Sequence, residues 1–253
     1  MDWAQVTLFF LILARMSGFV LFNPLFGRST VPAIVKSGLI FLLSITAFSM
    51  TTYLPAVPQT ILELGVLLLL EMAVGYLVGI VMNLFFYIPL LGGETIDIQM
   101  GMSMGKTYDP GSQASTTVTA SLLNILMMLL FFVGNGHHTL LRIFLSSGRI
   151  VPFGQVGFGQ DTYQAIIELF ISCTIMGIKL CMPILAAELL GQVAMGILMK
   201  VIPQINVFAI NIELKVIIGL VLLLLLMTPF SEFLLRAESE MLLEIQRLLA
   251  GMG

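Results

Sequence analysis

Residues 61–91 read ILELGVLLLLEMAVGYLVGIVMNLFFYIPLL, an apolar stretch interrupted only by Glu63, Glu71, Asn83 and Pro89. A membrane-spanning helix needs about 20 apolar residues, so this stretch is long enough to cross a bilayer. Similar stretches recur along the chain, with one short member, at 3–22, 37–54, 120–133, 165–201 and 207–230. The pattern predicts an all-α, multi-helix fold that is integral to a membrane or buried in a membrane-associated assembly.

The composition of the 253-residue chain supports the same class. Hydrophobic residues make up 58% of it and charged residues 10%, with a mean hydropathy of +1.07. A soluble domain carries about 25% charged residues, so this chain has too few charges to cover a water-facing surface. The net charge of -3 is spread over single residues. Nucleic-acid binding needs a basic face, so no nucleic-acid partner is expected.

We expect residues 1–253 to form a single helical membrane domain. Long loops are predicted near 92–119, which is rich in Gly, Ser, Thr and Met, and near 134–162, which contains Gly and Pro. After Pro229, apolar and charged residues alternate at helical spacing. This predicts an amphipathic helix over 230–250, suited to a membrane surface, a partner groove or the continuation of a span into water.

Simple membrane topology conflicts with the charges. An uncharged N-terminus followed by Arg28 and Lys36 predicts a cytoplasmic first loop, yet six alternating spans then put Arg236 and Arg247 outside. Either one segment does not span, or the helices do not lie in lipid in the usual way. Charges at mid-bilayer cost about 2.5–3.5 kcal/mol each, so protein neighbours or water are expected around Arg15, Glu71, Lys179, Glu188, Glu213 and Lys215.

Small residues at helical spacing predict close helix contacts. Glu71, Gly75 and Gly79 share one helix face, and Ala187 and Gly191 repeat the spacing beside Glu188. Faces of this kind let two backbones approach closely. We expect them to serve helix packing or partner contact inside an oligomer.

The segment 100–111 reads MGMSMGKTYDPG. Methionine side chains are flexible enough to seal irregular gaps, and the last three residues form a turn signal. Two interpretations stay open from the residues alone: a plug that closes a pore, or an ordinary flexible connector. The plug candidates are Gly101, Met102, Ser103, Met104, Gly105, Lys106, Tyr108, Asp109, Pro110 and Gly111.

Two further motifs lie between apolar segments. Asn135-Gly136-His137-His138 predicts a turn and helix start capped by Asn135, and adjacent histidines point in different directions on a helix, which disfavours a metal site. The run PQINVF at 203–208, with Pro203, Gln204 and Asn206, predicts a tight helix–helix turn or, alternatively, a partner contact.

Enzymatic chemistry is not expected. We find no nucleophile–base arrangement, phosphate-binding loop or paired catalytic carboxylates, and therefore expect no cofactor and no metal. Cys173 and Cys181 lie in one apolar run. In a helix they would be about 12 Å apart, too far for a disulfide.

Four motifs in the same order resemble the FliR/SctT family of type III secretion export-gate proteins. They are Arg15-Met16-Ser17-Gly18 with Asn23-Pro24, then Gly92-Gly93-Glu94 leading to Met100–Asp109-Pro110, then the NGHH run, then the PQINVF run. The last two favour the flagellar branch, and the resemblance covers essentially the whole chain.

The resemblance implies a subunit similar to a fusion of a FliP-like and a FliQ-like protein. One copy would join several FliP-like and FliQ-like subunits in a closed complex, at the flagellar basal body in the bacterial inner membrane, through which unfolded flagellar proteins are secreted. FlhB and FlhA would be neighbours. Most of such a gate stands above the bilayer, which would explain the topology conflict, and the family's plug loop corresponds to about 101–117 here.

A small secondary transporter is the competing interpretation. In a transporter, buried charges such as Arg15 and Glu188 would bind an ion or substrate. It would function as a single chain or a homo-oligomer, whereas a gate subunit is one chain among unlike partners.

Overall fold

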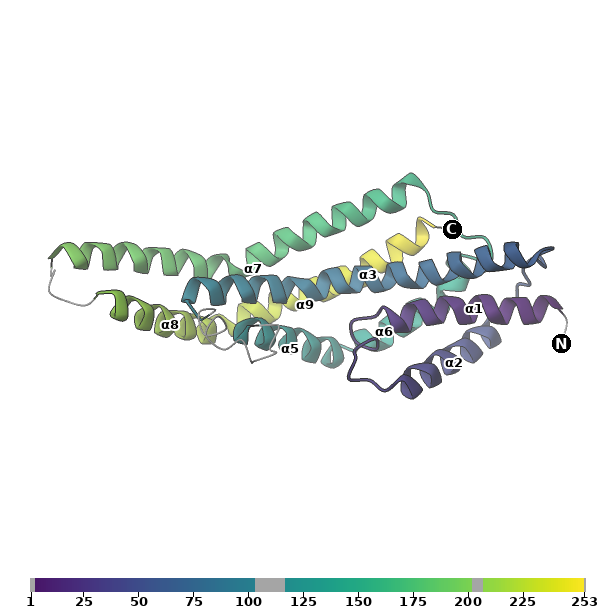
Figure 1. Ribbon diagram of the computed structural model, residues 1–253, viewed down its shortest axis with the longest axis horizontal. Coiled ribbons are helices and arrows are strands. Elements are labelled where there is room, and N and C mark those ends of the chain that lie inside the picture. The colour runs from purple at the N-terminus through teal and green to yellow at the C-terminus, as the bar shows by residue number, and fades with distance from the viewer. Residues whose placement is uncertain (1–2, 103–116, 202–206, 253) are drawn as a thin grey trace. The chain divides into compact units, whose positions relative to one another are not determined.

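The computed structural model describes residues 3–102, 117–201 and 207–252, and within these ranges the chain forms helices and turns with no strand. The all-α class is therefore confirmed for the described part. Figure 1 traces the helices in chain order. They are α1 (Trp3–Leu21), α2 (Ala33–Met50), α3 (Ile61–Met100), α5 (Val118–Val133), α6 (Gly136–Ile150), α7 (Gln160–Val201), α8 (Val207–Leu225) and α9 (Met227–Ala250).

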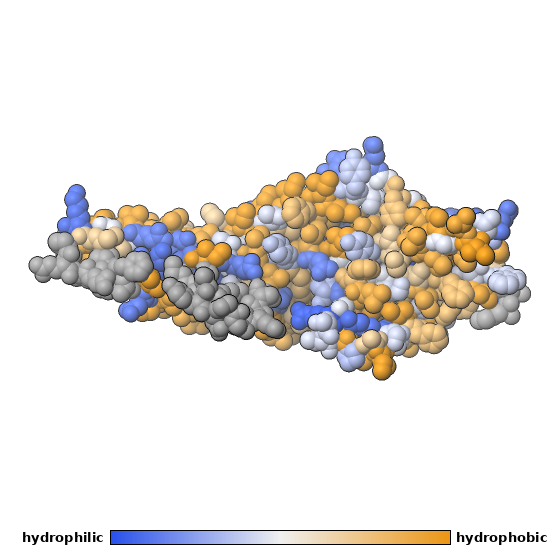
Figure 2. All heavy atoms as spheres, viewed as in Figure 1, coloured by the Kyte–Doolittle hydropathy of each residue, from blue (hydrophilic) through white to orange (hydrophobic). Residues whose placement is uncertain are grey.

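Four of these helices are long and apolar enough to cross a membrane: α1, α2, α3 and the Thr162–Val201 part of α7. The pairs α5 with α6 and α8 with α9 reach the same criterion only when each is taken as one broken span, which would give up to six. Apolar residues also cover much of the face shown in Figure 2. The chain thus has the character of a membrane protein.

The loop predicted over 92–119 is wrong for its first part, because residues 92–100 continue α3. The glycines that suggested a loop serve close packing instead. A Cβ on Gly93 would lie 2.3 Å from Cα of Ala120 in α5. Glycine therefore marks a helix contact here, at the cost of some helix propensity.

The loop predicted over 134–162 is also wrong for most of its length, because α6 occupies Gly136–Ile150. Its buried residues recur at i, i+3, i+4 and i+7, the spacing of one helix face: Leu140, Ile143, Phe144 and Ser147. The Gly and Ser residues around them obscured this pattern. A helix was expected over 230–250, and α9 begins slightly earlier, at Met227.

The contacts divide the chain into two compact units. The first comprises Met1–Phe85, Asn135–Phe170 and Glu238–Gly253. Here α1 packs along α2, and the rings of Phe41 and Phe48 meet Phe9 edge to face. Phe19 of α1 stacks on Phe144 of α6, with ring centroids 3.9 Å apart. Aromatic packing thus joins three helices of this unit.

Within this first unit, α1 and α3 approach each other at the level of their backbones. A Cβ on Gly75 would lie 2.3 Å from the carbonyl oxygen of Arg15, and one on Gly18 would lie 2.3 Å from that of Met72. Asn83 of α3 donates a hydrogen bond from Nδ2 to the carbonyl oxygen of Phe22, at 2.9 Å. Glycine is required at such a crossing because no other residue leaves enough room.

The second unit comprises Phe86–Gly134 and Ile171–Ala237. The end of α3 packs against α5, α7 and α8 in this unit. A Cβ on Gly177 of α7 would lie 2.8 Å from Leu91, and one on Gly219 of α8 would lie 2.6 Å from the side chain of Met100. Large side chains of α3 therefore fill the space left by glycines of its neighbours.

The crossing of α1 and α3 can be tested with one methyl group. We expect Gly75→Ala to lower the free energy of unfolding by roughly 1–3 kcal/mol, because the Cβ would meet the backbone of α1. Gly65→Ala is the matched control in the same helix, since nothing lies within 4 Å of its Cβ position. Circular dichroism during heating in detergent measures both, and equal stability of the two variants would contradict the packing.

Candidate functional site

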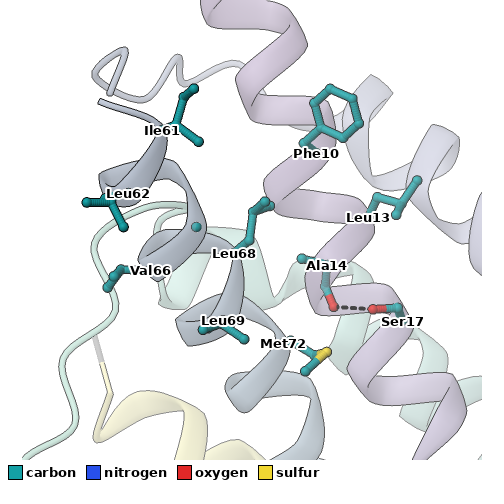
Figure 3. Close-up of a pocket in the computed structure, with 11 residues that line it drawn as sticks. Phe10, Leu13, Ala14, Ser17, Ile61, Leu62, Val66, Leu68, Leu69 and Met72 are labelled. Atoms are coloured by element: carbon teal, nitrogen blue, oxygen red, sulfur yellow. Dashed lines mark hydrogen bonds between the residues drawn. The ribbon is translucent and has the colours of Figure 1, made fainter. Parts of the chain in front are cut away.

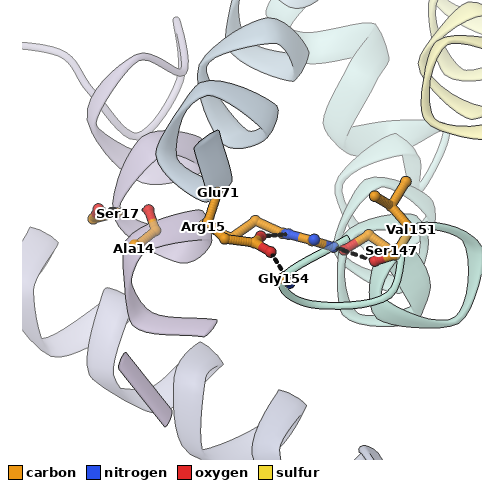
Figure 4. Close-up of polar contacts among 7 residues, drawn as sticks. All are labelled: Ala14, Arg15, Ser17, Glu71, Ser147, Val151 and Gly154. Carbon is orange, nitrogen blue, oxygen red and sulfur yellow. Dashed lines mark hydrogen bonds and ion pairs between the residues drawn. The ribbon is translucent and has the colours of Figure 1, made fainter. Parts of the chain in front are cut away.

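The first unit is centred on an ion pair between Arg15 of α1 and Glu71 of α3. Nε of Arg15 donates to Oε2 of Glu71 at 2.5 Å, and both side chains are 0% exposed. Both charges interrupt apolar helices, where an unpaired charge is strongly unfavourable. Figure 4 shows the two side chains meeting between α1, α3 and the end of α6.

The pair is completed by groups at the end of α6 and in the turn that follows it. Nη1 of Arg15 donates to the carbonyl oxygen of Val151 at 3.0 Å and to Oγ of Ser147 at 3.4 Å. Oε1 of Glu71 accepts the backbone N–H of Gly154 at 2.7 Å. Gly154 has a φ of +83°, a left-handed conformation that favours glycine.

The guanidinium group of Arg15 also lies over an aromatic ring. Its Cζ is 4.2 Å from the centroid of Phe153, a distance suited to a cation–π interaction. The edge of the same ring occupies the space beside Gly148, where a Cβ would lie 2.4 Å from it. Arg15 and Glu71 therefore connect α1, α3, α6 and the turn after α6, which is a positioning role and not a reactive one.

The other charges of the apolar helices fall into two groups. Glu188 of α7 is buried, with the charge of Lys215 in α8 acting on it. Lys179 of α7 and Glu213 of α8 are exposed on the surface of the chain. The expected protein neighbours are thus found inside the chain for Arg15 and Glu71, whereas Oε1 of the buried Glu188 has no hydrogen-bond partner among the described residues.

The two small-residue faces differ in what they contact. Gly75 and Gly79 lie against α1 of the same chain, and a Cβ on Gly79 would be 2.7 Å from the carbonyl oxygen of Phe22. Ala187 and Gly191 are half-buried, and a Cβ on Gly191 would be 3.7 Å from Ile218, an ordinary van der Waals distance. Space for a larger side chain therefore exists at Gly191.

The NGHH motif forms the junction between α5 and α6, and two expectations for it are wrong. Asn135 makes no side-chain cap and instead adopts φ 57°, a left-handed conformation that asparagine tolerates. The rings of His137 and His138 face each other, with centroids 4.1 Å apart. His137 and His138 lie in the first turn of α6, so no preceding turn of that helix restricts their side chains. Gly136, the first residue of the helix, is buried.

Most of the predicted plug lies outside the described residues. Gly101 and Met102 are described, whereas Ser103, Met104, Gly105, Lys106, Tyr108, Asp109, Pro110 and Gly111 are not. Pro203, Gln204 and Asn206 of the PQINVF run also lie outside. Of the predicted plug, the structure therefore describes only Gly101 and Met102.

Sequence reasoning missed the role of Asp97 and did not assign one to Asn23. Asp97 is fully buried at the end of α3 and bonds to the start of α5. Oδ1 of Asn23 accepts the N–H of Leu25 at 2.8 Å, while Nδ2 contacts the sulfur of Met82 at 3.1 Å. The pair Asn23-Pro24 is a turn signal that could have indicated the role of Asn23. No local pattern indicates the role of Asp97.

An open apolar groove of about 640 Å³ lies between α1 and α3 (Figure 3). Its lining includes Phe10, Leu13, Leu62, Val66 and Leu69. The hydroxyl of Ser17, which also lines it, donates to the carbonyl oxygen of Ala14 in its own helix. Such a surface suits apolar chains and offers little to orient a polar cofactor. Among the described residues there is also no cluster suited to a metal ion.

The ion pair makes a double-mutant test possible. We expect Arg15→Met or Glu71→Leu alone to lower the free energy of unfolding by about 3–5 kcal/mol, because each leaves a buried charge unpaired. The double variant should lose less than the sum of the two. Unfolding in detergent measures the three variants, and strictly additive losses would show that the two charges do not stabilise each other.

A sequence model of the family described as bacterial export proteins, family 1, matches residues 6–241. Flagellar biosynthetic protein FliR of Bacillus subtilis (strain 168) is 28% identical over 252 residues, covering 97% of this chain and 95% of that protein. The FliR of Escherichia coli (strain K12) is 27% identical over 245 residues, covering 95% and 93%. That of Aquifex aeolicus (strain VF5) is 25% identical over 211 residues, covering 83% and 81%.

These matches confirm the resemblance that the four ordered motifs predicted. The family match extends over nearly the whole chain, including the helices that carry the ion pair between Arg15 and Glu71. The chain therefore belongs to family 1 of the bacterial export proteins.

Proposed function

We propose that the chain is a component of the flagellar protein export apparatus and helps to form and close the pore through which unfolded flagellar proteins are secreted. The observation that carries this proposal is similarity to flagellar biosynthetic proteins over almost the full length of the chain. The single match over 6–241 also supports treating residues 1–253 as one membrane domain. A component of this kind is a structural or transport subunit and not an enzyme.

The exposed charges support a location among other subunits. Lys179 and Glu213 lie on apolar helices and are exposed on the isolated chain, although a charge facing lipid at mid-bilayer costs several kcal/mol. Partner subunits or water would remove this cost. FliP-like and FliQ-like subunits are the partners we propose, with FlhB and FlhA as neighbours, in the bacterial inner membrane at the flagellar basal body. A gate of this kind, with this chain similar to a fusion of the first two, would hold helices partly out of lipid.

The closing role is assigned to the segment that begins at Gly101. Its Met and Gly composition suits a seal that yields to a passing chain. Gly101, with φ +79°, ends α3 sharply and starts the connection to α5. In the proposal, residues 101–111 fill the pore when no substrate is present and move aside during export.

The alternative of a small secondary transporter is not favoured. The family that matches is one of export proteins. Within the described part of the chain, Arg15 and Glu71 are fully buried and pair with each other and with groups of α6 and the turn after it, although Nη2 of Arg15 has no hydrogen-bond partner there. Because the two opposite charges pair with each other, their contacts support a packing role.

The assembly can be weighed directly. We expect gentle extraction of the tagged chain from native membranes, followed by native mass spectrometry, to give a large hetero-oligomer with one copy of this chain and several smaller membrane proteins. Partners of this kind would cover the charges of Lys179 and Glu213, which are exposed on apolar helices of the isolated chain. A monomer or homodimer without them would contradict the gate and favour a transporter.

The closing role can be tested by shortening the segment. We expect replacement of residues 103–116 by a short Gly-Ser linker to make cells permeable to small ions, because the pore loses its seal while the helix ends remain. Ion flux across the membrane is measured in cells that secrete flagellar proteins, with assembly checked by mass spectrometry. Unchanged permeability in an assembled, export-competent complex would refute the plug.

A further inference from the structure

A second pocket of the first unit, of about 540 Å³, lies where two helices end. Thr52 and Tyr53 follow the end of α2 at Met50, and Arg149 lies in the last turn of α6. Gln155, from the turn after α6, completes its polar side. Unlike the apolar groove between α1 and α3, this pocket is lined by several hydrogen-bond donors, and no carboxylate of a described residue lines it.

The two sides of the pocket come from distant parts of the chain and are joined by a hydrogen bond. Nε2 of Gln155 donates to the hydroxyl oxygen of Tyr53 at 2.9 Å. Val151 precedes a proline, which disfavours helical backbone, and it is extended. The ring of Phe153 then occupies the space beside Gly148, in the last turn of α6. The chain therefore folds back after α6, and Gln155 reaches the residues that follow α2.

Three donors of this pocket have no acceptor in the described part of the chain. Because the Tyr53 oxygen accepts the bond from Gln155, its own O–H remains to donate. Neither the hydroxyl of Thr52 nor the guanidinium of Arg149 has a hydrogen-bond or ion-pair partner among the described residues. The pocket thus presents a full positive charge beside two hydroxyl donors, and this combination suits an anion.

The helix ends beside the pocket oppose an anion only weakly. Carbonyl groups at a helix C-terminus carry partial negative charge. At the end of α2, however, the N–H of Thr51 bonds to the carbonyl oxygen of Phe48 at 3.3 Å, and its hydroxyl bonds to that of Ala47 at 2.8 Å. At the end of α6, the N–H of Val151 bonds to a carbonyl oxygen of the last turn. These bonds reduce the negative potential, so the full charge of Arg149 dominates.

We propose that this pocket binds a phosphate group. A guanidinium group matches phosphate because it donates two parallel hydrogen bonds in a fixed geometry. Two kinds of molecule carry such a group: a phospholipid in its headgroup, and inorganic phosphate. The position favours the lipid, since the pocket begins where α2, which is apolar enough to cross a membrane, ends. Met50, Leu145 and Pro152 also line it and offer an apolar wall to the rest of a lipid. The site is independent of the export function proposed above.

Lipid binding can be measured on the full chain in detergent by native mass spectrometry. We expect the chain to retain phosphatidylglycerol in preference to diacylglycerol, which has the same acyl chains without the phosphate. Arg149→Gln should weaken this retention about tenfold, because it removes a charge-assisted hydrogen bond, and Tyr53→Phe should weaken it less. Arg142→Gln is the matched control, since Arg142 is an exposed arginine of the same helix that does not line the pocket.

Inorganic phosphate is tested in a parallel arm, by circular dichroism during heating with phosphate or chloride at equal ionic strength. A lipid preference that Arg149→Gln removes, with no effect of inorganic phosphate, supports the site and identifies the lipid as its source. A rise in melting temperature with inorganic phosphate that Arg149→Gln removes and Arg142→Gln keeps supports the site with free phosphate as the source. The proposal is overturned if Arg149→Gln changes neither result, or if phosphatidylglycerol is retained no better than diacylglycerol and inorganic phosphate has no effect.

Discussion

The burial of the Arg15–Glu71 ion pair constrains the whole first unit of this protein. Neither charge can reach water, so each needs its full set of partners in place. Those partners come from α6 and from the turn that follows it, at Val151 and Gly154. A shift of α1 along α3 would break several bonds at once, and the glycine crossing beside the pair would not permit a different approach. The ion pair thus specifies the register of these helices.

Polar groups are needed to select the native helix packing because the chain is so apolar. Where leucine and valine lie both inside and outside a protein, hydrophobic burial alone cannot distinguish the native packing from a rotated one. Small residues and satisfied polar groups make this distinction. Gly75 allows only a close crossing, and Asp97 accepts bonds only from the particular helix ends that meet it. Gly75 lies in the first unit and Asp97 in the second, so both units use this kind of specification.

The helical membrane class and one helix contact face could be predicted because short stretches of sequence indicate them. Apolar stretches gave the membrane class, and the spacing of Glu71, Gly75 and Gly79 indicated a contact face. Glycine was ambiguous, however: the same residue type suits a loop and a tight helix contact. The helical course of residues 92–100 and of Gly136–Ile150 was missed for this reason.

Long-range polar contacts could not be predicted. Asp97 and Thr119 are separated by 22 positions, and neither stands out in its own segment. The local sequence also does not indicate whether a charged residue in an apolar helix is buried. Arg15 is enclosed by partners from distant parts of the chain, whereas Lys179 is exposed. Composition predicts that such a charge needs a partner, and only the fold shows whether the chain supplies it.

This difference bears on the conflict between the charges and simple membrane topology. Arginine at a helix interior does not indicate an aqueous side when it is paired inside the fold, so Arg15 carries no topological information. Lys179 and Glu213 remain exposed within apolar helices, and a lipid environment would leave both unsatisfied. Partner subunits of the kind proposed above would satisfy these charges, and hydropathy alone does not distinguish a surface that proteins cover from one that lipid covers.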